Sequence, residues 1–188
     1  MNYSIPLSQP IIFKEAKKLL INCVDSNWVS SSGKYVDEFE KNIASFTGSK
    51  YAIACSSGSA ALQVSLLLAG VNKNDEVIAP SLTFIASVNA ISHVGATPVF
   101  MDSDDYFNID VKKTIQFLKY ETFMKKGFVY NKKTKQRISA IMPVHVWGNA
   151  VDLKNLILEC KKRNIQIVED ATESLGTFYS IGSLKGKH

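Results

Sequence analysis

Residues 51–69 read YAIACSSGSAALQVSLLLA: a short apolar run, a turn of small residues and a longer apolar run. The first run, Tyr51 to Cys55, has the length and composition of a buried strand. Residues 56–59 form the turn, and the run from Ala60 to Ala69 is long enough for a helix that ends at Gly70. A strand, a turn and a helix in this order predict the repeating unit of an α/β fold.

The same alternation continues on both sides of this stretch. Apolar residues at helical spacing, or an N-cap residue such as Asp110, predict helices, while short apolar runs bounded by turn residues predict strands. Together they favour an α/β fold, a largely parallel sheet with helices on both faces. The expected helices cover 35–47, 84–93, 110–118 and 151–162, and the expected strands cover 76–79, 97–101, 138–144 and 165–169.

The segment from Tyr120 to Arg137 interrupts that alternation. Its six basic residues and one acidic residue account for the whole net charge of +5. We expect a hairpin with a basic tip, which is either a solvated surface insertion or a means of attracting a phosphorylated substrate. Because the rest of the chain is neutral, its charge does not indicate a nucleic-acid partner.

Cysteine usage and hydropathy indicate a cytoplasmic protein. Cys23, Cys55 and Cys160 form no C-x-x-C pair, so neither disulfides nor a zinc site is predicted, and Cys55 is expected to be a small buried hydrophobe. The start lacks a signal-peptide pattern. The longest mostly apolar stretch, 60–71, has about 12 residues, whereas a membrane span needs about 20. We therefore expect no membrane partner.

The turn Ser57-Gly58-Ser59 is a candidate anion site. It precedes a predicted helix, where backbone N–H groups and the helix dipole bind phosphate, and Gly58 lets the backbone approach the ligand closely. The alternative is an ordinary turn in which Ser59 is the N-cap. The turn is neither G-x-G-x-x-G nor a Walker sequence, which argues against a plain nucleotide-binding module.

Asp170 is a candidate ligand-binding acid. It follows the predicted strand 165–169, at the sheet edge where α/β proteins bind ligands. A carboxylate held there favours a cationic partner, such as a protonated ring nitrogen, and otherwise serves as a helix N-cap or a loop carboxylate. Glu173 either hydrogen-bonds a group on the same side of the loop or is solvated.

Phe84 and His145 complete the candidates. Phe84, at the start of a predicted helix, either stacks on a flat ring or packs in the core. His145 lies just past a predicted strand. With no Cys or carboxylate at ligand spacing, it does not indicate a metal site.

Four motifs closely resemble the pyridoxal-phosphate-dependent nucleotide-sugar aminotransferases of the DegT/DnrJ/EryC1/StrS family. In order, they are CSSGSAAL (55–62), PSLTFIAS (80–87), PVHVWG (143–148) and VEDATESLG (168–176). The resemblance extends from Pro6 to the end of the chain. It implies the large domain of the PLP-dependent transferase fold (aspartate aminotransferase-like, fold type I), with pyridoxal 5′-phosphate as the cofactor.

The resemblance implies contacts to both the phosphate and the pyridine ring of the cofactor. Gly58 and Ser59, with the adjacent Ser57, match the turn that binds its phosphate. Phe84 matches the aromatic residue that stacks on its pyridine ring.

The remaining matches lie near the pyridine ring. Asp170 matches the acid that keeps the ring nitrogen protonated, which makes the ring an electron sink. His145 matches a histidine beside the cofactor. Glu173 stands where many members carry Gln or His near the ring hydroxyl, so an acid there is a departure from the family pattern.

For the intact protein, the resemblance implies amino transfer from an amino acid, L-glutamate in most relatives, to a nucleotide-linked keto-sugar in surface-glycan or amino-sugar biosynthesis. It also implies a homodimer. Two alternatives stay open. One is a sugar dehydratase of the same family, in which His replaces the Lys that forms the Schiff base. The other is a non-catalytic remnant or partner subunit.

The Schiff-base Lys is expected to lie outside this chain. Ser180 and Lys185 share the family's Ser-x-x-x-x-Lys spacing, but they follow Asp170 too soon and lack the preceding aromatic-rich strand, so we interpret the match as coincidence. Residues 1–188 then correspond to the N-terminal part of the large domain, with an insertion at about 120–137. The remaining large-domain strands and the small C-terminal domain are expected to be absent.

Overall fold

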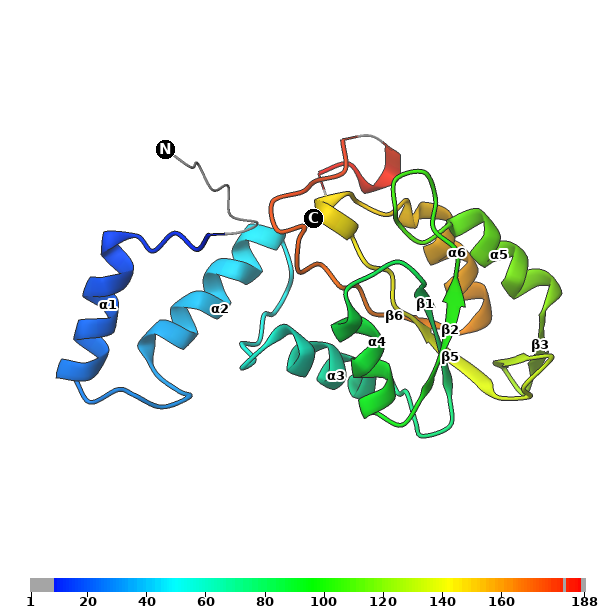
Figure 1. The fold of residues 1–188 in the computed structure, drawn as a ribbon, viewed down its shortest axis with the longest axis horizontal. Coiled ribbons are helices and arrows are strands. Elements are labelled where there is room, and N and C mark those ends of the chain that lie inside the picture. Colours follow the sequence, from blue (N-terminus) through cyan, green and yellow to red (C-terminus); the bar gives the residue numbers. More distant parts are fainter. Residues whose placement is uncertain (1–8, 181, 187–188) are drawn as a thin grey trace, which may run out of the picture. The chain divides into compact units, whose positions relative to one another are not determined.

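The computed structural model describes residues 9–180 and 182–186 (Figure 1). The chain divides into two compact units, Met1–Ile53 and Ala54–His188. No helix among the described residues has both the length and the apolar composition that a membrane crossing requires.

The first unit consists of two helices. Helix α1 covers Lys14–Asp25, and helix α2 covers Lys34–Thr47, which confirms the helix predicted at 35–47. Gly48 ends α2 in the left-handed region, at φ +69°, which a glycine adopts without steric strain. Among the described residues, α1 and α2 have no buried side chain, although each has the apolar stripe of an amphipathic helix.

The second unit is built on a sheet that has six strands among the described residues. The strand order is β2-β1-β5-β4-β3, and β6 also pairs with β5. Strands β1, β2, β5 and β6 run parallel, while β3 and β4 make antiparallel pairs, so the predicted, largely parallel sheet is confirmed. The bounds are β1 Glu76–Pro80, β2 Thr97–Met101, β3 Thr122–Lys125, β4 Phe128–Asn131, β5 Arg137–Ile141 and β6 Gln166–Ile167.

Four α-helices pack on the two faces of this sheet, as predicted. The Asp110 side chain accepts from the Lys113 backbone N–H at 2.9 Å, so it caps α5 as its sequence position indicates. One short 3-10 helix, Val146–Gly148, follows β5. A second, Gly182–Leu184, lies near the C-terminal end of the described residues. The α-helices are α3 Gly58–Leu68, α4 Ile85–His93, α5 Val111–Tyr120 and α6 Leu153–Arg163.

Alternation along β1 divides the core between the two faces. Val77 packs in one cluster with Leu66 of α3 and residues of α4, whereas Ile78 packs in the other with Leu156 of α6. All of these side chains are completely or almost completely buried, and each contributes roughly 1.5–3 kcal/mol to folding. This core fixes the strand ends on which the site is built.

The prediction of a strand at Tyr51–Cys55 is wrong. These residues form no regular element, and Tyr51 and Ile53 are 72% and 78% exposed. An apolar run permits a strand but does not by itself make one, and the sheet of the described chain does not include residues 51–55. Cys55 is consequently exposed, not buried as expected.

The two strands that lead to the site are shorter than predicted. β5 ends at Ile141 and β6 at Ile167, although their pairing continues through an isolated parallel bridge between Val144 and Asp170. Pro143 lacks a backbone N–H, which interrupts the regular ladder, but its carbonyl accepts from the Asp170 N–H at 2.9 Å.

The basic segment 120–137 forms strands β3 and β4 and the turn into β5. The predicted hairpin is confirmed by the antiparallel pairing of β4 with β5, and a further hairpin, β3–β4, precedes it. The segment precedes β5 and pairs with its first residues, so it lies at the end of the parallel strands opposite to Val144 and Asp170. That placement supports the surface insertion and argues against a role in attracting substrate to the site.

Candidate functional site

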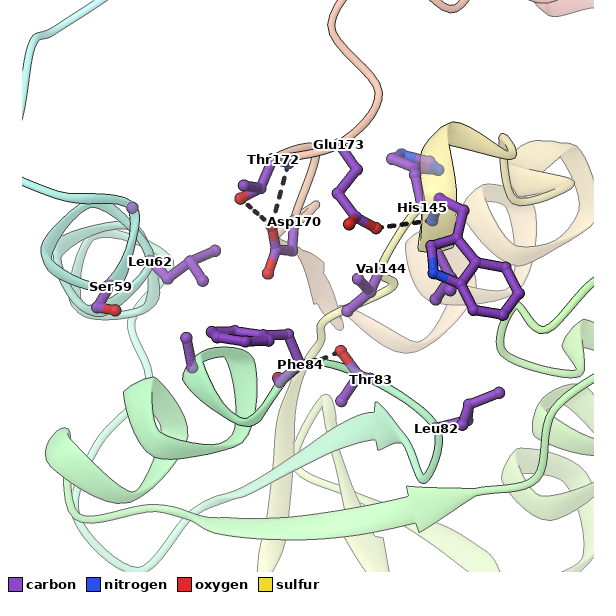
Figure 2. Close-up of a pocket in the computed structure, with 14 residues that line it drawn as sticks. Ser59, Leu62, Leu82, Thr83, Phe84, Val144, His145, Asp170, Thr172 and Glu173 are labelled. Atoms are coloured by element: carbon purple, nitrogen blue, oxygen red, sulfur yellow. Dashed lines mark hydrogen bonds between the residues drawn. The ribbon is translucent and has the colours of Figure 1, made fainter. Parts of the chain in front are cut away.

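A cavity of about 590 Å³ opens at the C-terminal ends of β1, β5 and β6 (Figure 2). This is the edge at which open α/β sheets bind ligands. Six of the seven predicted site residues line it, and Ser57 does not. The lining consists of Gly58, Ser59, Leu62, Leu82, Thr83, Phe84, Ala86, Val144, His145, Val146, Trp147, Asp170, Thr172 and Glu173.

Asp170 is buried at the floor of this cavity, and its carboxylate is held by neutral donors. The Ser87 hydroxyl donates to Oδ2 at 2.6 Å, while the Thr172 hydroxyl and N–H donate to Oδ1 at 2.7 and 3.2 Å. No cationic side chain among the described residues forms an ion pair with it. A carboxylate offers about four acceptor positions, so a further donor, such as a protonated ring nitrogen, can be accommodated.

The N-terminus of α3 forms one side of the cavity. Ser57 is the N-cap, and its hydroxyl accepts from the Ala60 N–H at 3.2 Å, so the expectation that Ser59 is the cap is wrong. Gly58 and Ser59 become the first helical residues, whose N–H groups have no intrahelical partner by position. A Cβ at Gly58 would lie 3.8 Å from Thr172 Oγ1, so this helix terminus lies close to the loop that carries Asp170.

Phe84 immediately precedes α4, and its ring points into the cavity (Figure 2). The side chain is 79% exposed, so the interpretation of Phe84 as a core residue is wrong. A ring of this size exposed on a cavity wall provides an apolar surface on which a flat ligand can stack.

His145 lines the cavity but is itself only 5% exposed, and both of its ring nitrogens have protein partners. The Val151 N–H donates to Nδ1 at 3.0 Å, so Nδ1 carries no proton. The proton therefore lies on Nε2, which is 3.0 Å from Glu169 Oε2. Among the described residues, no group of three or more His, Cys, Asp or Glu side chains could hold a metal ion.

Tyr179 extends this hydrogen-bond chain. Its hydroxyl donates to the Val151 carbonyl at 2.6 Å, and burial, together with the nearby Glu169 charge, raises the pKa of Tyr179 to about 12. The hydroxyl thus stays protonated and continues to donate over the physiological pH range.

Glu173 is not merely solvated. Its Oε2 accepts from the backbone N–H of Trp147 at 2.7 Å. Trp147 lies in the left-handed region, at φ +52°, a conformation that costs a residue other than glycine about 1–2 kcal/mol. Gly148 follows at φ +80°, and a Cβ there would lie 3.0 Å from the Glu173 carbonyl oxygen.

Sequence reasoning missed Ser87, Thr172 and Trp147. Ser87 is completely buried in α4, three residues after Phe84, but the helix also carries Asn89 and Ser92, so the sequence does not single out Ser87. Thr172 falls between two predicted site residues. Trp147 stands inside a quoted motif, but its exposure depends on a turn that the pattern does not reveal.

Comparisons with known proteins agree on one family. The DegT/DnrJ/EryC1/StrS aminotransferase family matches residues 10–185. The chain is 37% identical over 184 residues to the GDP-perosamine synthase of Escherichia coli O157:H7, covering 98% of this chain and 45% of that protein. It is 36% identical over 175 residues to the dTDP-3-amino-3,6-dideoxy-alpha-D-galactopyranose transaminase of Aneurinibacillus thermoaerophilus, covering 91% and 44%.

Solved structures show the same likeness. The aminotransferase from Psychrobacter cryohalolentis superposes with a TM-score of 0.77 at 29% identity, covering 96% of this chain and 43% of that one. The PLP form of Spr1654 from Streptococcus pneumoniae gives a TM-score of 0.75 at 27% identity, covering 97% and 47%. This chain therefore spans less than half the length of the proteins that it matches.

Proposed function

Because this chain belongs to the DegT/DnrJ/EryC1/StrS aminotransferase family, we propose that the protein carrying it transfers an amino group from an amino acid to a nucleotide-linked keto-sugar. The proposed donor is L-glutamate, and the proposed setting is surface-glycan or amino-sugar biosynthesis in the cytoplasm. The names of two curated relatives, a GDP-perosamine synthase and a dTDP-linked amino-sugar transaminase, support this substrate class.

The cofactor of the family is pyridoxal 5′-phosphate, and the residues of this cavity fit it at both ends. The first N–H groups of α3, at Gly58 and Ser59, suit a phosphate. The Asp170 carboxylate, buried and bound only by neutral donors, suits a protonated pyridine nitrogen. The single observation that carries the proposal is that these two groups open into one cavity.

When bound, the cofactor supplies an electron sink for the carbon atom that exchanges its amino group. Asp170 holds the proton on the ring nitrogen, and without that proton the ring withdraws electrons poorly. Ser87 and Thr172 orient the carboxylate and favour its charged form by donating to it. Phe84 packs against the ring and excludes water from one face of it.

The overall reaction exchanges two groups between two substrates. The amino acid leaves as a 2-oxo acid, and the sugar carbonyl becomes a carbon bearing an amino group and a hydrogen. We assign the cofactor-binding part of this work to residues 1–188, the N-terminal part of the large domain. The Lys that would move protons at the reacting carbon, and the second subunit of a homodimer, are proposed to lie outside this chain.

A turnover assay tests the proposed function. The gene product that contains this chain is incubated with pyridoxal 5′-phosphate, L-glutamate and 4-keto-6-deoxy sugars linked to GDP or dTDP. We expect formation of 2-oxoglutarate together with a sugar nucleotide whose mass fits replacement of the carbonyl by an amine. Loss of a sugar hydroxyl without amine incorporation would instead identify a dehydratase, and no reaction with any sugar nucleotide would contradict the proposal.

A further inference from the structure

The turn that follows β5 is held by side chains from two other segments, although it contains no group that the chemistry above requires. The Asn108 side chain accepts from the Val146 N–H at 3.1 Å and donates to the Asn149 carbonyl at 3.1 Å. Thr177 donates to the Gly148 carbonyl at 2.9 Å, and Glu173 accepts from the Trp147 N–H at 2.7 Å. These bonds hold the turn in its strained conformation.

What this turn presents to the cavity is an indole ring. Trp147 is 67% exposed and lines the same cavity as Asp170 and Phe84. The Phe107 ring meets it edge-on, with centroids 5.0 Å apart and an interplanar angle of 65°. That contact supports the indole from one side and leaves most of its surface open. A large aromatic ring exposed on the wall of a cavity provides an apolar surface that a ligand can cover.

We propose that Trp147 is the platform on which the pyranose ring of the nucleotide-linked sugar lies, and that Glu173 is a positioning residue that holds this platform in place. The inference rests on the proposed function. An indole face attracts the C–H groups of a sugar ring, because its negative π-face complements their weak positive charge. Trp147 lines the cofactor cavity itself, which the sugar carbonyl must enter, whereas the nucleobase is two phosphates farther away.

The position of Glu173 gives a reason for an acid at this place in the loop. Its carboxylate forms a charge-assisted bond to a backbone N–H in a turn with positive φ angles at Trp147 and Gly148. A side chain without an acceptor would release that N–H and allow the turn to relax, which would move the indole. Gln keeps an acceptor oxygen and therefore serves as the matched substitution.

Binding measurements on the cofactor-loaded protein that contains this chain test the platform. Calorimetry would compare GDP-mannose and dTDP-glucose, two unreactive probes, in the wild type, Trp147→Ala and Trp147→Phe. We expect Trp147→Ala to weaken binding of the better probe by about tenfold and Trp147→Phe by about threefold or less. The affinity for pyridoxal 5′-phosphate should not change in either variant. Equal sugar-nucleotide affinities in the wild type and Trp147→Ala would overturn the inference.

A spectroscopic measurement distinguishes the sugar from the base. Residues 1–188 contain two tryptophans, Trp28 and Trp147, so the Trp147 emission is taken as the difference between the spectra of Trp28→Phe and Trp28→Phe/Trp147→Phe. This emission should shift on addition of GDP-mannose or dTDP-glucose and stay unchanged on addition of GDP or dTDP alone. An equal shift with the nucleotides alone would overturn the assignment to the pyranose ring. Absence of binding by any sugar nucleotide in the wild type would contradict the proposed function as well.

Substitutions at Glu173 test its positioning role. Glu173→Gln should keep the sugar-nucleotide affinity within about twofold, whereas Glu173→Ala should weaken it by about fivefold or more. The Trp147 emission of the Trp28→Phe chain should change in Glu173→Ala and not in Glu173→Gln. If both substitutions leave emission and affinity as in the wild type, Glu173 does not position the indole.

Discussion

Two buried carboxyl groups lie at opposite ends of the same sheet and differ in what can reach them. Glu76 begins β1, is 1% exposed and accepts from the Asn131 side-chain amide at 2.9 Å. Asp170 follows β6, is 6% exposed and accepts from Ser87 and Thr172. Both are buried and hydrogen-bonded, but Asp170 also lines the cavity. Burial of an acid therefore indicates a binding site only where a ligand can complete its set of donors.

The largest expected effect comes from removing the acid that a ligand can reach. Asp170→Ala should lower the turnover of the protein by at least about a hundredfold, because charge developing at the reacting carbon is no longer stabilised through the ring nitrogen. Some pyridoxal 5′-phosphate should remain bound through the α3 N-terminus. Asp170→Asn, which keeps the size but removes the charge, should be similarly inactive. Turnover at the wild-type rate in either variant would rule out the role.

Removing Asn131, the hydrogen-bond partner of Glu76, should affect stability and not function. Asn131→Ala leaves the Glu76 carboxyl without its side-chain donor and should lower the free energy of unfolding by about 1–3 kcal/mol. Urea unfolding measures the change, with the exposed hairpin substitution Lys133→Ala as the control. The affinity for pyridoxal 5′-phosphate should match that of the wild type. A loss of cofactor affinity as large as that of Asp170→Ala would contradict the distinction between Glu76 as a structural acid and Asp170 as a binding-site acid.

Another buried ionisable group, Cys160 of α6, predicts a pH dependence of stability. Burial raises the pKa of the Cys160 thiol from 9.0 to about 12. The unfolded chain therefore loses the thiol proton first. This contribution to stability is present below pH 9 and is lost as the pH rises toward 12, by up to about 1.4 kcal/mol per pH unit. Unfolding curves of Cys160→Ala should show a shallower decline above pH 9, and an identical decline would contradict the prediction.

The smallest effect is expected at the basic hairpin. Replacing Lys125, Lys126 and Lys133 by Gln changes charge only at the N-terminal end of the sheet, far along the strands from the cavity. The KM for the sugar nucleotide should stay within about twofold of the wild type at low salt, where electrostatic attraction is strongest. A severalfold, salt-dependent increase in KM would restore the role in substrate attraction that the fold argues against.

The sequence predicts the elements whose pattern is local and misses what depends on distant partners. The short apolar run of β1, the helical spacing in α2 and the Asp110 N-cap of α5 are visible within a dozen residues, and each element forms as predicted. Residues 51–55 have the same apolar signal as β1 but are not part of the sheet in the described chain, because an apolar composition alone does not make a strand.

The site shows the same division between local and distant information. The four motifs bring Gly58, Phe84 and Asp170 into one cavity, as their resemblance to the family implies. Ser87 donates to a carboxylate 83 residues away, and the Trp147 N–H donates to an acid 26 residues later. Neither contact leaves a periodic or spaced signal in the sequence.

The protonation of the cofactor's ring nitrogen tests the central claim most directly. Nitrogen NMR of pyridoxal 5′-phosphate labelled with ¹⁵N in the ring would compare the cofactor bound to the wild type and to Asp170→Ala. The account predicts the shift of a protonated pyridine nitrogen in the wild type at neutral pH, and of an unprotonated one in the variant. The same shift in both proteins would contradict it.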